Sequence, residues 1–325
     1  MRRLIGSVAA VLMTCLAVPA AAEATADYPS RLITLIVPFA PGGTSATLGN
    51  LIGERLGQRL NQKVVVMFRP GATGNIGSQS VATADPDGYT LLLGTIATHG
   101  INPSIYKKMP YDHIKDFVPV SNLGSVPNIL FVNPALPVKT VPELIAYLKS
   151  KPGKLNYASP GVGASNHMAS ELLKMMSNTD MKHIAYKGSG PAMQDVIAGH
   201  VEVMFDNSVS AWPQIRAGRV RALGVATPER LKSAPDLPAI AEFLPGFAVS
   251  AWYGLFAPAK TPPAIVEKIS AAVRDILKES SVAASLERMD FIAAGGTPVE
   301  FANFVQAETD RWKTVVDRIG LEKIE

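Results

Sequence analysis

The sequence predicts an α/β protein with two lobes, each built on a doubly wound sheet, that are joined by two crossing strands. Three observations lead to this fold class. Short β-branched segments alternate with segments whose apolar residues recur at helical spacing. Glycine and proline are frequent, with 26 and 25 of 325 residues, and are scattered as in short loops. Two apolar stretches interrupt the alternation, as expected where a chain crosses between lobes.

The first strand and helix set the pattern. Residues 33–37 are largely β-branched and end at Pro38, and Leu48, Ile52 and Leu56 then recur on one helical face. The alternation continues with strands at 63–68, 90–93, 128–132, 155–158, 182–186 and 201–205, and with helices at 73–84, from Thr140, from Ser165 and from Ser189. Two further helices are predicted at 264–278 and 297–319. Strands alternating with helices indicate parallel sheets covered on both faces.

The lobe boundaries are expected where Gly/Pro-rich loops flank short apolar stretches, near residues 122–127 and 247–256. We therefore predict a discontinuous first lobe of residues 23–125 plus 250–325. The second lobe, residues 126–249, is inserted into it. The two crossing strands would form a hinge.

Residues 1–22 have the pattern of a secretory signal peptide. Arg2 and Arg3 precede an apolar run, and a small-residue site ends at Ala22, after which we expect cleavage. The only cysteine, Cys15, lies within this leader, so disulfides are not expected in the mature protein. Beyond the leader no segment is apolar enough to span a bilayer.

Composition excludes two classes of protein. A content of 47% hydrophobic and 18% charged residues is globular and excludes a disordered chain. A net charge of +4 without any basic tract argues against a nucleic-acid partner.

Two glycine-rich junctions, 38–45 and 159–167, each follow a strand and open a helix. Backbone N–H groups at such a position suit an anion, although each junction could equally be a plain turn that uses glycine for geometry. Loops at the carboxyl ends of parallel strands form the usual binding crevice, and having two such junctions in two lobes favours a binding site.

Enzyme and cofactor motifs are incomplete. Asn166 stands where a dinucleotide fingerprint needs its third glycine, and His167 replaces the last glycine of a nucleophile elbow around Ser165. The five histidines, His99, His113, His167, His183 and His200, have no metal-binding spacing. We therefore expect no cofactor, no metal and no enzyme activity.

Eight motifs in order resemble the Bug family, the substrate-binding proteins of tripartite tricarboxylate transporters. They are Tyr28-Pro29, Val37-Pro38-Phe39-Ala40-Pro41-Gly42-Gly43, Arg69-Pro70-Gly71-Ala72-Thr73-Gly74-Asn75-Ile76-Gly77, Asp85-Pro86-Asp87-Gly88-Tyr89-Thr90-Leu91, Ser159-Pro160-Gly161-Val162-Gly163, His183-Ile184-Ala185-Tyr186-Lys187-Gly188, Ala217-Gly218-Arg219-Val220-Arg221-Ala222-Leu223 and Trp252-Tyr253-Gly254-Leu255-Phe256-Ala257-Pro258. Together they span nearly all of the mature chain.

The resemblance implies a monomeric periplasmic binding protein of the type II-like fold, which closes on a small carboxylate and delivers it to a two-component integral membrane permease. By similarity the ligand contacts in the first lobe are Phe39, Ala40, Gly42, Gly43, Thr44, Thr95, Ala97 and Thr98. In the second lobe they are Ser159, Gly163, Ser165, His167, Tyr186, Gly188 and Asp206. Ala46 and Asn50 depart from the family pattern, where an Asp and an Arg are usual, which changes the expected first-lobe contacts.

Three questions stay open at the level of sequence. The same pocket would serve a ligand-sensing module for a membrane kinase, and a periplasmic hydrolase is a weaker alternative. The ligand is a dicarboxylate, a tricarboxylate, an amino acid or an aromatic acid. Asp206 either faces the distal end of the ligand or only caps the following helix.

Overall fold

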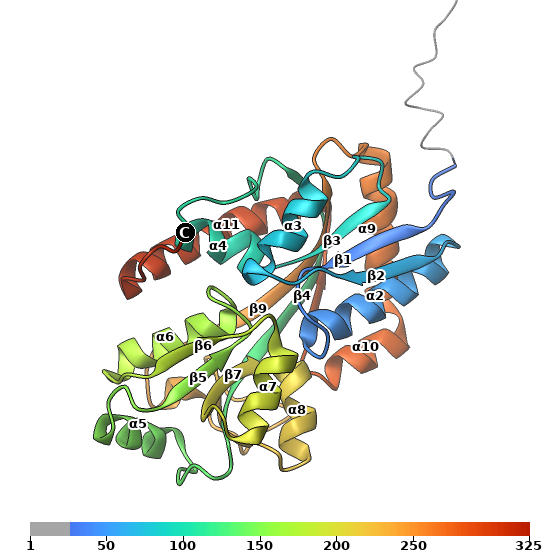
Figure 1. Ribbon diagram of the computed structural model, residues 1–325. Helices are drawn as coiled ribbons and strands as arrows, with labels where there is room; N and C mark the ends of the chain where they lie inside the picture. Colours follow the sequence, from blue (N-terminus) through green and yellow to red (C-terminus); the bar gives the residue numbers. More distant parts are fainter. Residues whose placement is uncertain (1–26) are drawn as a thin grey trace, which may run out of the picture.

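The computed structural model describes residues 27–325, so the predicted leader and its cleavage site lie outside the described residues. Two lobes are stacked along the long axis of the molecule (Figure 1). The two-lobed α/β fold predicted from the sequence is confirmed. The residue boundaries of the lobes stay our proposal, and we use them below.

The first lobe is built on a sheet in the order β2-β1-β3-β9-β4. β1 (Ile33–Val37) lies parallel to β2 (Val64–Phe68) and β3 (Thr90–Thr95), whereas β9 (Ser250–Pro258) runs antiparallel to β3. On one side lie α2 (Thr44–Leu60), α9 (Pro263–Lys278) and α10 (Ser280–Glu287), and on the other α3 (Asn75–Ala82), α4 (Asn102–Ile105) and α11 (Pro298–Ile319) (Figure 1). Short helical turns at Ala72–Gly74 and Ala97–Ile101 and the edge strand β10 (Ile292–Gly295) complete this lobe.

The second lobe continues the same sheet. The distal half of β4 pairs with β7 (Val203–Asn207) and β8 (Arg221–Val225), and β5 (Asn156–Ser159) lies parallel to β7 and to β6 (Lys182–Ala185). Its helices are α5 (Val141–Ser150), α6 (Ser165–Ser177), α7 (Ser189–Ala198) and α8 (Ser208–Arg216), with a short turn at Ile240–Glu242.

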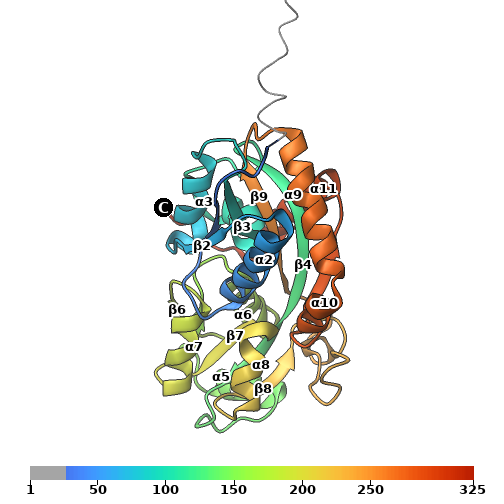
Figure 2. The same cartoon turned by 90° about the vertical axis from the view of Figure 1, so that its right-hand side faces the viewer.

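β4 (Phe117–Val132) extends from the first lobe into the second (Figure 2), and β9 begins at the boundary, where the chain returns to the first lobe. The two strands pair antiparallel from Phe117 opposite Pro258 to Pro127 opposite Ser250. A lobe-to-lobe connection of two paired strands permits bending about one line, which is the geometry of a hinge.

The sheets are mixed, whereas the sequence predicted parallel sheets. β1, β2, β3 and β5, β6, β7 are parallel, but the crossing strands β4 and β9 pair antiparallel with their neighbours. An apolar strand sequence indicates that the strand is buried on both faces, but it does not indicate whether the strand pairs parallel or antiparallel with its neighbours. The antiparallel pairing of β4 and β9 could therefore not be predicted from the sequence.

Both lobes have a well-filled apolar core. Strand residues such as Leu35, Leu92 and Phe131 are fully buried, and they pack beneath amphipathic helices. Within residues 27–325, no helix has the length and apolarity needed to cross a membrane.

Candidate functional site

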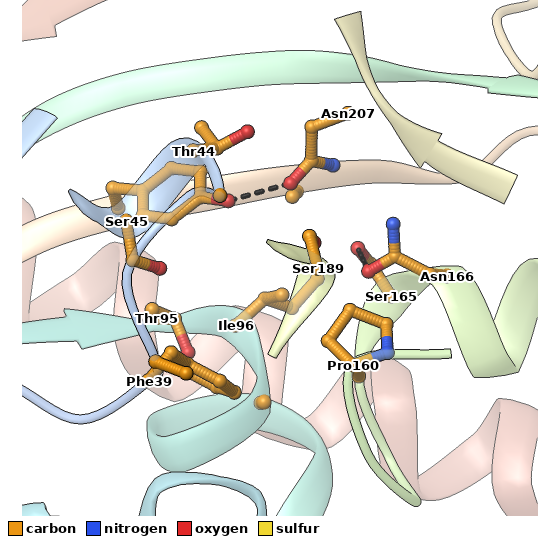
Figure 3. Close-up of a pocket in the computed structure, with 16 residues that line it drawn as sticks. Phe39, Thr44, Ser45, Thr95, Ile96, Pro160, Ser165, Asn166, Ser189 and Asn207 are labelled. Atoms are coloured by element: carbon orange, nitrogen blue, oxygen red, sulfur yellow. Dashed lines mark hydrogen bonds between the residues drawn. The ribbon is translucent and has the colours of Figure 1, made fainter. Parts of the chain in front are cut away.

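A cavity lies between the lobes, at the ends of the loops that the sequence analysis singled out. We call it the ligand cavity. From the first lobe it is lined by residues of the 39–45 and 95–97 loops, and from the second by residues 160 and 164–166 with Ser189 and Asn207. Ala251 and Tyr253 of β9 also line it. Figure 3 shows Thr44 and Ser45 on one side of the cavity and Ser165 and Asn166 on the other. In this closed form the cavity is small, about 30 Å³, which is room for about one water molecule, so a larger ligand needs the lobes to part.

The amino ends of helices converge on this cavity. α2, α6 and α7 begin at Thr44, Ser165 and Ser189, all of which line it, and α8 begins one residue after the lining Asn207. In the described chain none of these four helices has a side-chain cap or an acidic residue in its first turn. Each such end leaves N–H donors without intrahelical partners and carries about half a positive charge. An anion in the cavity would satisfy these donors.

The cavity wall itself carries no formal charge. Among the described residues no lysine, arginine, aspartate or glutamate lines it, and its polar groups are hydroxyls and amides. Anion binding here would therefore depend on backbone donors and helix dipoles rather than on an ion pair.

Contacts between the lobes hold the cavity narrow. The Ala40 N–H donates a hydrogen bond to the Lys187 carbonyl oxygen over 3.0 Å. Beside it Gly42 and Gly190 meet so closely that a Cβ on Gly190 would stand 2.4 Å from the carbonyl oxygen of Pro41. Deeper in, the Tyr253 hydroxyl donates to Asn207 Oδ1 over 2.6 Å (Figure 3). The lobes are thus closed upon each other in this structure.

Asp206 lies behind the second-lobe wall and is fully buried. Its carboxylate accepts hydrogen bonds from the hydroxyls of Ser189 and Ser210 at 2.8 and 2.7 Å, from Asn166 Nδ2 at 3.2 Å and from the Asn207 N–H at 2.8 Å. Burial raises the pKa of Asp206 to about 6, and the hydrogen bonds, first that from Ser210, oppose the shift. The carboxylate thus joins the amino ends of α6, α7 and α8.

A stack of aromatic rings supports the 159–166 loop from behind. His183 Nε2 and Ser159 Oγ are 2.6 Å apart, and the rings of His183 and His167 stack at 4.3 Å. His167 Nδ1 accepts the Gly163 N–H, so it carries no proton at that nitrogen. Burial lowers the pKa of His183 to about 4, with a smaller contribution from the Lys174 charge. Both rings are therefore neutral near pH 7.

The structure brings part of the expected site together in the cavity wall. The expected residues that line the cavity are Phe39, Ala40, Gly43, Thr44, Thr95, Ala97 and Ser165. Those that do not line it are Gly42, Thr98, Ser159, Gly163, His167, Tyr186, Gly188 and Asp206.

The residues outside the wall have other partners. Gly42 and Gly188 pack against the facing lobe, and the Tyr186 hydroxyl donates to Asp195 over 2.6 Å. The Thr98 hydroxyl donates to the Thr95 carbonyl oxygen over 3.1 Å. These side chains shape the loops rather than face the cavity.

Several wall residues were not expected from the sequence: Ser45, Ile96, Pro160, Ala164, Asn166, Ser189, Asn207, Ala251 and Tyr253. Most are neighbours of expected residues, and the predicted helix start at Ser189 was an available signal. Tyr253 carried no such signal, because only the folded crossing strand brings it to the cavity. Within residues 27–325 no group of His, Cys, Asp or Glu side chains is arranged to hold a metal ion.

Comparisons with known proteins agree with the two-lobed fold. The family model described as "Tripartite tricarboxylate transporter family receptor" matches residues 50–321. Protein BugT of Bordetella pertussis is 35% identical over 92% of this chain and 93% of its own. A protein from the tcbD-tcbE intergenic region of Pseudomonas sp. strain P51 is 38% identical over 89% of this chain and 86% of its own.

Two solved structures of similar proteins carry ligands. An R. palustris protein with adipate is 36% identical, with a TM-score of 0.90 over 92% of this chain and 100% of that chain. MatC from Rhodopseudomonas palustris with bound malate is 37% identical, with a TM-score of 0.85 over 89% of this chain and 100% of that chain. Both ligands are small carboxylates.

Proposed function

Because this chain belongs to the tripartite tricarboxylate transporter receptor family, whose members are periplasmic solute receptors and not enzymes, we propose that it captures a small carboxylate for import. The closed, ligand-bound receptor then delivers its cargo to the two-component integral membrane permease of such a transporter. The receptor acts as a monomer, with residues 126–249 moving as one lobe against the rest.

The observation that carries the proposal is the convergence of uncapped helix ends on a cavity without charged walls. An anion there gains several charge-assisted hydrogen bonds from N–H groups that otherwise lack partners. A neutral molecule gains less, because the helix dipoles favour negative charge only. The malate and adipate found in similar proteins support a carboxylate as the anion.

Of the expected site residues, we propose Thr44, Thr95 and Ser165 as hydroxyl contacts to the ligand, since they line the cavity from both lobes. Backbone groups of Ala40 and Gly43 complete the first-lobe side. Closure about β4 and β9 brings these contacts together around the ligand.

Calorimetry tests the proposal with malate, adipate and their amides. A carboxylate should bind measurably and its amide at least about tenfold more weakly, since one lost charge-assisted hydrogen bond costs roughly 1.5–3 kcal/mol. Equal affinity for the amide would contradict the proposal.

We also propose that the chain is exported and cleaved after Ala22, on the strength of the leader pattern. The intact mass of the protein recovered from the periplasm should correspond to a chain that begins at Glu23. A mass that retains residues 1–22 would contradict this.

A further inference from the structure

We infer that the second-lobe wall of the ligand cavity offers hydrogen-bond acceptors, so that the preferred carboxylate carries a hydrogen-bond donor, as a hydroxy acid or an amino acid does. The inference rests on the proposed function of this site. The residue that sets the polarity is Asp206, which acts as a positioning residue because it lies behind the wall and orients the groups that form it.

The hydrogen bonds around Asp206 fix the direction of its partners. Within the described chain no lysine, arginine or histidine contacts its carboxylate, which accepts four hydrogen bonds and donates none when ionised. Ser189 has a single hydroxyl proton and gives it to Asp206 over 2.8 Å. Toward the cavity, Ser189 therefore presents only lone pairs.

Two further wall residues have their protons committed in the same way. The Asn166 amide donates to Asn128 Oδ1 over 3.1 Å and to Asp206 over 3.2 Å, and its own Oδ1 accepts the Ser165 hydroxyl over 3.4 Å. The Tyr253 hydroxyl donates its only proton to Asn207 Oδ1. Ser189 in the second lobe and Tyr253 on the crossing strand therefore have no proton left to donate and act as acceptors toward the cavity.

Such a wall discriminates between ligands of the same charge. The ligand carboxylate is held at the N–H groups of the helix ends, and a hydroxyl or ammonium group beside it can donate to the acceptor wall. A ligand without that donor leaves the wall acceptors unpaired in a closed cavity, which costs affinity. An ionised carboxylate placed against the wall is repelled by the lone pairs and by Asp206.

Matched ligand pairs test the inference. Malate differs from succinate, and lactate from propionate, by one hydroxyl group. In calorimetry with the wild-type protein, we expect the hydroxy acid to bind at least tenfold more tightly than its partner without the hydroxyl, in either pair that shows binding. Binding of both members with equal affinity would overturn the inference and leave the proposed function standing. Failure of every carboxylate, including adipate, to bind would count against the proposed function itself.

Two serine variants distinguish the effect of the wall acceptors from a general disturbance of the hydrogen bonds around Asp206. Ser189 and Ser210 both donate to Asp206, but only Ser189 lines the ligand cavity. Ser189→Ala should reduce the preference for the hydroxy acid at least threefold, whereas the matched control Ser210→Ala should keep it. Asp206→Asn frees a serine proton and should also reduce the preference. An unchanged preference in Ser189→Ala would refute the role of this wall.

A second inference comes from the opposite face of the crossing strand β9. Ala251 and Tyr253 face the ligand cavity, so Trp252 between them faces away. The Trp252 indole N–H donates to Glu308 Oε2 over 3.0 Å, and Trp312 donates to the same oxygen over 3.2 Å. Trp312 in turn lines a groove between α6 and α11, which we call the hinge groove.

The hinge groove separates two apolar stripes that belong to different lobes. Met168, Leu172 and Met176 lie on one face of α6, and Trp312, Val315 and Ile319 lie on one face of α11. Its empty space of about 900 Å³, including the part open to solvent, leaves Met175 at its edge 41% exposed. Figure 1 shows α6 and α11 on the same flank of the molecule, one in each lobe.

The geometry points to the hinge groove as a counterweight to closure. The ligand cavity and the groove lie on opposite faces of the crossing strand, so bending that opens the cavity narrows the groove. The two stripes then bury apolar surface against each other, which stabilises the open, ligand-free form. The free energy of ligand binding has to exceed this stabilisation of the open form before the lobes close.

A bulky side chain in the groove tests the counterweight. Val315→Trp should wedge the stripes apart, favour closure, reduce the radius of gyration of the ligand-free protein in solution scattering and tighten malate or adipate binding severalfold. Met175→Lys should act in the same direction, because the open form would bury its charge in a groove that Arg311 and Arg318 also line. Met67→Lys is the matched control, since Met67 is also 41% exposed but lies on β2, away from the groove. Unchanged affinity and radius in both groove variants would overturn the inference.

Discussion

Removing a single backbone N–H at the start of α6 provides the sharpest test of anion binding by helix ends. Ser165 is the first residue of this helix and lines the ligand cavity, and its N–H has no partner in the helix. Ser165→Pro deletes that N–H, and proline fits the first helical position well. Ala164 before it has φ −64° and ψ 152°, the conformation that a residue before proline prefers.

The expected magnitude follows from the bond that is lost. A hydrogen bond from a backbone N–H to an ionised carboxylate contributes roughly 1.5–3 kcal/mol, so Ser165→Pro should bind roughly 10- to 150-fold more weakly than Ser165→Ala, which loses the hydroxyl alone. The helix itself keeps all its intrahelical hydrogen bonds. The free energy of unfolding should therefore change by less than about 1 kcal/mol.

Two control variants isolate the effect of the N–H. Ser165→Ala removes only the proposed hydroxyl contact and keeps the N–H, so it is the reference with which the affinity of the proline variant is compared. Ser280→Pro places proline at the first position of α10, away from the ligand cavity, and should leave affinity unchanged. Calorimetry gives the affinities and urea denaturation the stabilities. Equal losses in Ser165→Pro and Ser165→Ala would refute the view that the backbone N–H binds the anion.

Three other predictions follow from the site. Burial raises the pKa of Asp206 from 3.8 to about 6, so ionising this carboxyl costs the folded state free energy. In urea denaturation, the stability of the wild type relative to Asp206→Asn should therefore fall by up to about 3 kcal/mol between about pH 4 and pH 7. A difference that does not change with pH would contradict this. The pKa of buried His183 lies near 4, so as the pH falls below 6.5 this histidine takes up its proton in the unfolded chain before it does so in the folded protein. The stability of the wild type should therefore decline toward pH 4 more steeply than that of His183→Gln. Parallel stability profiles would argue against a buried neutral ring. Gly190→Ala should hinder lobe closure, because the added Cβ would stand 2.4 Å from the Pro41 carbonyl oxygen. It should weaken ligand binding without a loss of thermal stability. Unchanged affinity would mean that the lobes close without this contact.

Much of the fold was predictable because local signals and burial agree. The predicted strand at 33–37 and the predicted helix starts at Ser165 and Ser189 match β1, α6 and α7. Thr297 forms the expected capping box, in which its hydroxyl accepts the Glu300 N–H. The antiparallel pairing of β4 and β9 was not predictable, because strand direction depends on contacts between residues more than a hundred positions apart.

The loops of the site were also predictable, but the roles of individual side chains were not. His167 was expected as a ligand contact, yet its Nδ1 accepts the Gly163 N–H and its ring stacks on His183 behind the loop. Asp206 was read either as a ligand contact or as a cap, and the structure places it behind the wall with four hydrogen bonds. A sequence shows which residue types follow a strand, but not which way each side chain turns.

This limit has a physical origin that also bears on how such receptors differ from one another. Backbone N–H groups at helix ends recognise negative charge whatever side chains surround them. A glycine-rich loop after a strand therefore predicts that an anion binds, but not which anion. The polarity of a hydroxyl is different, because it depends on where its single proton goes, and for Ser189 a carboxylate 17 positions away in the sequence decides this. Replacing Asp206 would therefore reverse the polarity of a wall that it does not line. Ligand choice in this fold can change through buried residues behind the cavity, while the loops that mark it as an anion site stay the same.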